Sequence, residues 1–65
     1  MTARERIESR ITLLECENQD YLRKIKEYCL DVQSIELYSR YIRENQKAIT
    51  ELKWAMEILE IDNKH

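Results

Sequence analysis

The spacing of the apolar residues is the strongest constraint on the fold, because they recur every three or four positions along most of the chain. This period is typical of a helix that packs along one side against another helix. A first row occupies the N-terminal half: Ile7, Ile11, Leu14, Tyr21, Ile25, Tyr28, Val32 and Ile35. A second row occupies the C-terminal half: Ile35, Tyr38, Ile42, Ile49, Leu52, Met56 and Leu59. The chain contains no glycine and no proline and is 37% charged, a composition close to that of long helices and coiled coils.

The two apolar rows differ in phase. The steps from Val32 to Ile35 and from Ile35 to Tyr38 are both three residues, whereas an unbroken row alternates threes and fours. Such a break means either that a continuous helix is locally overwound or that the chain turns. Asp31 and Ser34 favour the turn, because both residue types are good N-caps for a following helix.

Each row is interrupted by one polar residue, Asn18 in the first and Asn45 in the second. Folding the chain between residues 31 and 32 places these two asparagines opposite each other and sets the apolar positions face to face. A buried amide without a partner costs about 1–3 kcal/mol. Two facing asparagines that satisfy each other would therefore set the register of the helices.

We therefore predict an all-α fold, an antiparallel helical hairpin of the coiled-coil type, in a single domain spanning residues 1–65. The expected helices cover residues 3–29 and 35–61, with a turn at residues 30–34. Two alternatives stay open at this point. The same pairing fits two uninterrupted helices that lie antiparallel as a dimer, and the turn could instead fall near Asn45.

A hairpin of this size has little interior, since small chains bury only about 60% of the surface that they expose when unfolded. The second predicted helix also carries more apolar residues than one contact row needs, so we expect two hairpins to form a homodimeric four-helix bundle. Tyr41 lies beside the row, and Trp54, Ile58 and Ile61 lie on another side of the helix. Tryptophan and tyrosine are enriched among residues that carry binding energy. These four residues are therefore the predicted partner-binding site.

The charged and reactive residues indicate a protein without catalytic activity. The formal net charge of −2 gives no reason to expect direct binding to nucleic acid, and no apolar run is long enough to cross a membrane. The only histidine is His65, and Cys16 and Cys29 lack the spacing of a metal or redox site. We expect no catalytic residues, no metal and no cofactor, and we expect the two thiols to be reduced, as in a cytoplasmic protein.

In size, helicity, charge balance and lack of catalytic groups, the chain resembles the small all-helical regulators that phages and mobile elements encode. This resemblance lies in general character and implies a homodimer that binds a transcription regulator of the host. A co-repressor or antirepressor of LexA would be one instance. The alternative interpretation is a structural coiled-coil oligomerisation module, or a subunit of a larger assembly.

Overall fold

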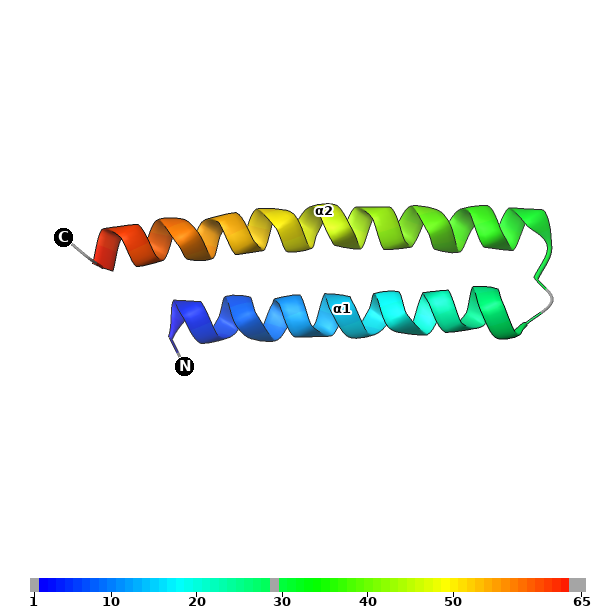
Figure 1. Cartoon of the computed structure of the whole chain (residues 1–65), viewed down its shortest axis with the longest axis horizontal. Coiled ribbons are helices and arrows are strands. Elements are labelled where there is room, and N and C mark those ends of the chain that lie inside the picture. Colours follow the sequence, from blue (N-terminus) through cyan, green and yellow to red (C-terminus); the bar gives the residue numbers. More distant parts are fainter. Residues whose placement is uncertain (1, 29, 64–65) are drawn as a thin grey trace.

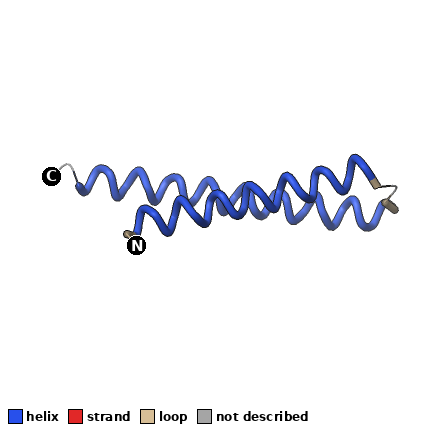
Figure 2. Tube along the Cα trace, turned by 90° about the horizontal axis from the view of Figure 1, so that it is seen from below, coloured by secondary structure: helices blue, strands red, loops and turns tan. Residues whose placement is uncertain are grey.

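The computed structural model of the chain describes residues 2–28 and 30–63. It contains two helices, α1 (Ala3–Glu27) and α2 (Val32–Asn63), which lie antiparallel as a hairpin (Figure 1). The molecule measures 52 × 18 × 13 Å, whereas one continuous helix of this chain would be roughly 100 Å long. The chain therefore turns, a few residues before the point where the two apolar rows change phase. Figure 2 shows the two helices crossing over each other near the middle of their length.

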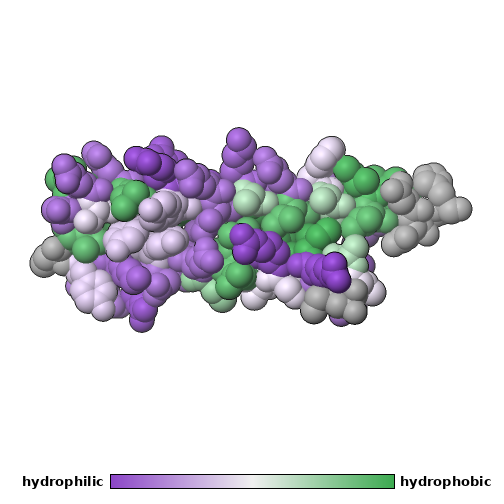
Figure 3. Space-filling model, turned by 180° about the vertical axis from the view of Figure 1, so that it is seen from behind, coloured by the Kyte–Doolittle hydropathy of each residue, from purple (hydrophilic) through white to green (hydrophobic). Residues whose placement is uncertain are grey.

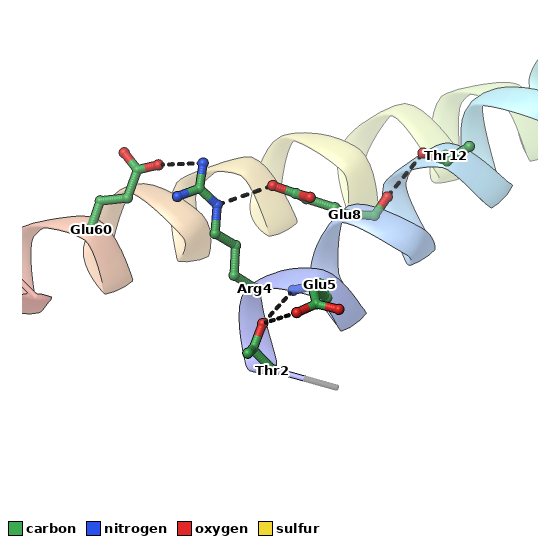
Figure 4. Close-up of polar contacts among 6 residues, drawn as sticks. All are labelled: Thr2, Arg4, Glu5, Glu8, Thr12 and Glu60. Carbon is green, nitrogen blue, oxygen red and sulfur yellow. Dashed lines mark hydrogen bonds and ion pairs between the residues drawn. The ribbon is translucent and has the colours of Figure 1, made fainter.

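The first turn of α1 is held by a cap at Thr2. The Thr2 Oγ1 atom accepts a hydrogen bond from the Glu5 backbone N–H at 3.1 Å, and the Thr2 hydroxyl donates to the Glu5 carboxylate at 3.2 Å (Figure 4). A side-chain oxygen at this position satisfies one of the backbone donors that a helix start leaves without a partner. The Thr2-to-Glu5 spacing also matches the capping-box pattern.

The first helix ends at Glu27, which is two residues earlier than predicted. Tyr28 takes an extended conformation with φ −106° and ψ 142°, and its N–H donates to the Lys24 carbonyl at 3.1 Å. Its side chain is 59% exposed. The prediction that Tyr28 belongs to the apolar contact row is therefore wrong, because the residue lies beyond the helix. Cys29, the predicted last helical residue, lies outside the described residues.

The second helix begins at Val32, three residues before the predicted start, and continues to Asn63, two residues past the predicted end. The reason for the early start is that Asp31, rather than Ser34, provides the cap. The Ser34 backbone N–H donates to Asp31 Oδ1 at 2.8 Å. The connection between the helices is therefore residues 28–31 instead of the predicted 30–34.

The core of the hairpin is small and lies toward the end where α1 begins and α2 ends. Its buried hydrophobic residues are Ile11, Leu14 and Ile49. The partly buried residues packed against them are Ile7, Ala48, Leu52 and Met56. Because α2 has 32 residues and α1 has 25, the last turns of α2 extend past the start of α1 (Figure 1). Neither helix, over the residues described, is long and apolar enough to cross a membrane.

Candidate protein-binding surfaces

A polar contact lies at the middle of the helix interface. Asn45 Nδ2 donates to Asn18 Oδ1 at 3.0 Å and to the Glu17 carboxylate at 3.2 Å. Asn18 Nδ2 donates to the Ile42 carbonyl at 3.4 Å, and the Asn18 side chain is buried. The two asparagines thus meet across the interface through one hydrogen bond, from Asn45 to Asn18. The Ile42 carbonyl and the Glu17 carboxylate are additional acceptors that the apolar pattern did not indicate. That the pair sets the register of the hairpin stays a prediction.

Three tyrosines gather between this polar contact and the turn. The ring of Tyr21 stacks on Tyr38 with centroids 5.5 Å apart and lies 5.6 Å from the ring of Tyr41. The Lys24 ammonium lies 6.0 Å from the centroid of Tyr38. Tyr41 was predicted as a partner-binding residue, and one side of its ring is already engaged within the hairpin. The remaining exposed part, 37% of the residue, faces outward.

The two broad sides of the hairpin differ in the residues that they present. On one side Gln19 and Leu22 of α1, with Ile42 and Gln46 of α2, line a shallow groove. The opposite side presents residues that follow one another at intervals of four on α1 and seven on α2, spacings that keep side chains on one side of a helix. We call this surface the alanine face, and it consists of Leu13, Glu17, Tyr21, Tyr41, Ala48 and Ala55. Figure 3 shows this side, where hydrophobic side chains gather over the C-terminal half of α2.

The other three predicted partner residues form a separate surface, which we call the tryptophan stripe: Trp54, Ile58 and Ile61. They follow at intervals of four and three and are 64%, 37% and 58% exposed. Leu52 and Met56, which pack on the core, stand two residues before and after Trp54. Because each residue turns the helix by about 100°, Trp54 projects from the side opposite the core. The stripe therefore points away from α1.

A group of exposed cations continues the outer side of α2 toward the turn. Arg40, Arg43 and Lys47 precede Trp54 at helical spacing, and all three side chains are exposed. None of them takes part in the ion pairs found among the described residues. The outer side of α2 thus carries these three cations, beside the exposed Glu36 and Glu44, along its first half and is apolar at the tryptophan stripe.

The ion pairs among the described residues are all exposed and stabilise the hairpin only weakly. Arg4 contacts Glu8 at 3.0 Å and Glu60 at 3.2 Å, and so joins the start of α1 to the last turns of α2 (Figure 4). Asp20 contacts Arg23 at 2.6 Å and Lys24 at 3.2 Å. Hydrogen bonds from Arg23 and Lys24 lower the pKa of Asp20, and the Asp20 carboxylate raises the pKa values of both cations.

Within residues 2–28 and 30–63 no group of three or more histidine, cysteine or acidic side chains is placed to hold a metal ion. Cys16 is an exposed free thiol on the outer side of α1. The other two reactive residues, Cys29 and His65, lie outside the described part of the chain.

Comparison with known proteins finds no matching family, no similar curated protein and no similar solved structure. The exposed surfaces of the hairpin are therefore the basis for proposing a function.

Proposed function

We propose that this protein is a cytoplasmic, non-catalytic protein-binding regulator that acts as a homodimer and modulates a transcription regulator of its host. Its action is of the co-repressor or antirepressor kind, and LexA is an example of such a target. The observation that carries the proposal is the tryptophan stripe. A large aromatic residue, 64% exposed, stands there in line with two exposed isoleucines on a helix.

The spacing of the stripe matches a known mode of recognition. Trp54, Ile58 and Ile61 occupy positions i, i+4 and i+7, the anchor positions of a helix that inserts its apolar side into a groove of another protein. The last turns of α2 extend beyond α1, which leaves room for a partner around that segment (Figure 1). The stripe therefore suits a partner that offers a hydrophobic groove about as long as two helical turns.

The exposed cations indicate the charge of that partner. Arg40, Arg43 and Lys47 lie on the same outer side of α2 as the stripe and have no acidic partner among the ion pairs of the described residues. Charged groups at the edge of an interface raise the association rate and select partners of opposite charge. The groove of the target should accordingly carry acidic residues at one end.

A structural coiled-coil module is the second candidate, and the seven-residue apolar repeat favours it. Such a module would also use exposed apolar residues, but only to bind copies of itself or other subunits of an assembly. The two candidates predict different binding by the tryptophan stripe. A regulator forms a discrete dimer whose stripe binds a different protein, whereas a structural module binds only copies of itself or other subunits of its assembly.

The test begins with capture of proteins from the native host on tagged wild type beside Trp54→Ala/Ile58→Ala. Leu22→Ala is the matched control, because Leu22 and Ile58 are equally exposed at 37% but lie on different sides of the molecule. The captured protein is then purified, and its binding to all three forms is titrated. We expect wild type and the Leu22 variant to bind one transcription regulator and to change its affinity for DNA, while the stripe variant binds at least tenfold more weakly. Equal binding by all three forms would reject the stripe as the site. Self-association without any target would favour the structural module.

A further inference from the structure

The hairpin exposes more surface than a compact protein of its mass. Its accessible surface is 5417 Å² for 8.0 kDa, whereas a compact monomer of this mass exposes roughly 4,450 Å². The excess, about 950 Å², is close to the roughly 800 Å² that each partner buries in a stable interface of ordinary size. If a second molecule covered one surface of this size, the accessible surface of the hairpin would fall to the value expected of a compact protein of its mass.

We infer that the occupant of the alanine face is a second copy of this chain, which packs there face to face and completes a four-helix bundle. This inference rests on the homodimer in the proposed function and names the surface that forms it. The short side chains of Ala48 and Ala55 allow another helix to approach closely, while Tyr41 supplies bulk one and two heptads away. Such alternation of large and small residues is what interlocking helices need.

The charged residues on the alanine face and at its edge determine how the second copy is oriented. Arg6 and Arg10 lie on the α1 part of the face, in line with Leu13 and Glu17, and Glu44 and Glu51 border the face on α2. A two-fold axis parallel to the helices places α1 of one copy over α2 of the other, so that Arg6 and Arg10 lie over the acidic edge of α2. An axis across the helices would instead oppose the acidic edge of one copy to the same edge of the other.

When the two-fold axis is parallel to the helices, residues at the same height along the two hairpins face each other. One specific pair of opposite charges is then brought together. The contacts from Asn18 to Asn45 and from Arg4 to Glu60 set the register of α1 against α2, and a parallel two-fold axis preserves that register between copies. Arg10 of one copy then lies within about one turn of Glu51 of the other, close enough for an ion pair. The same arrangement brings Glu17 near Glu44 of the second copy, a repulsion that keeps the dimer from being very tight.

The inferred dimer leaves Trp54 uncovered, whereas Ile58, seven residues after Glu51, continues the acidic edge of the alanine face. Trp54 is the residue before Ala55, so its side chain lies about 100° round the helix from the alanine face. Trp54 and Ile61 therefore stay free to contact a target, and the dimer presents two copies of each. Tyr41, in contrast, lies in the dimer interface.

Sedimentation equilibrium of the full chain tests this inference. We expect wild type to sediment with twice the monomer mass of 8.0 kDa, Ala48→Arg to sediment as a helical monomer, and Leu22→Arg, on the opposite broad side, to remain a dimer. Circular dichroism confirms that each variant keeps its helices. Wild type at 8.0 kDa throughout the concentration range, or a dimer that survives Ala48→Arg, would overturn the inference.

A charge exchange tests the orientation without changing the apolar residues. Arg10→Glu alone and Glu51→Arg alone each place two like-charge pairs in the dimer, so each should dissociate at least tenfold more readily than wild type. An equimolar mixture of the two variants restores opposite charges at both contacts and should form mixed dimers. Failure of the mixture to recover would contradict the arrangement. Because target binding is measured separately with the Trp54→Ala/Ile58→Ala variant, loss of the dimer and loss of the target site are distinguishable.

Discussion

Asn45 donates a hydrogen bond from Nδ2 to the Oδ1 atom of Asn18 at 3.0 Å, which joins the only two polar interruptions of the apolar rows. The Asn18 side chain is 7% exposed, so this oxygen has little access to water. We expect the contact to specify one register of α2 along α1, because a slip of a single heptad would bury both amides against apolar groups.

Removal of one member of this pair should destabilise the hairpin more than removal of both. We expect Asn45→Leu to lower the free energy of unfolding by about 1–3 kcal/mol, because the Asn18 oxygen is left without a donor. The double variant Asn18→Leu/Asn45→Leu should be at least as stable as wild type but should populate more than one register or oligomeric state. Urea unfolding measures the first effect, and disulfide exchange between cysteines placed at alternative registers measures the second. A double variant much less stable than wild type would refute the register-setting role.

The hairpin itself could be predicted from the sequence, because the change in phase near Ile35 and the two asparagines both depend only on spacing. The helix ends were harder to predict. Thr2 and Glu5 form a recognisable capping pattern, but Asp31 and Ser34 are equally good caps, and only the backbone geometry decides between them. The contact of Tyr21 with Tyr38 and Tyr41 could not be predicted either, since it depends on how side chains lean across the interface.

The small core should make single truncations costly. Leu14 is 3% exposed and belongs to a cluster of three buried hydrophobic residues. We expect Leu14→Ala to lower the free energy of unfolding by about 2–5 kcal/mol, much of what a domain of this size possesses. Leu22→Ala, at 37% exposed, removes the same atoms from a half-exposed site and should cost less than half as much. Thermal melts of the two variants beside wild type provide the comparison, and equal losses would mean that the core lies elsewhere.

The cap at Asp31 should make the start of α2 sensitive to acid. Hydrogen bonds from Ser34, first from its side chain and then from its backbone N–H, lower the pKa of Asp31. A lowered pKa in the folded state means that this stabilisation is present above about pH 3.8, the ordinary value, and is lost as the pH falls through the folded value. We therefore expect Asp31→Ala to melt below wild type at pH 7, and the difference to shrink at pH 2.

Asp31→Asn is the control for that experiment, because an amide oxygen accepts the same hydrogen bond at every pH. Its melting temperature relative to Asp31→Ala should not vary between pH 2 and pH 7. A pH-independent gap between wild type and Asp31→Ala would argue against the charged cap.

The cations on the outer side of α2 should accelerate target binding. We expect Arg43→Glu/Lys47→Glu to reduce the association rate with the target about tenfold at low salt and to change the dissociation rate little. The gap between wild type and variant should narrow as salt is raised, because exposed charges are screened. Stopped-flow measurements at two salt concentrations give both rates. Unchanged association would mean that the target does not carry the acidic edge proposed for its groove.

Trp54 is the only tryptophan in the chain, so its fluorescence reports directly on the central claim that a dimer presents an exposed stripe to another protein. Indole emission shifts to shorter wavelength when water around the ring is excluded. We predict that the emission stays that of an exposed indole while the protein is titrated from monomer to dimer, and that it shifts to shorter wavelength when the purified target is added. A shift that follows dimerisation, with none on addition of the target, would place Trp54 in the self-association interface and contradict the account.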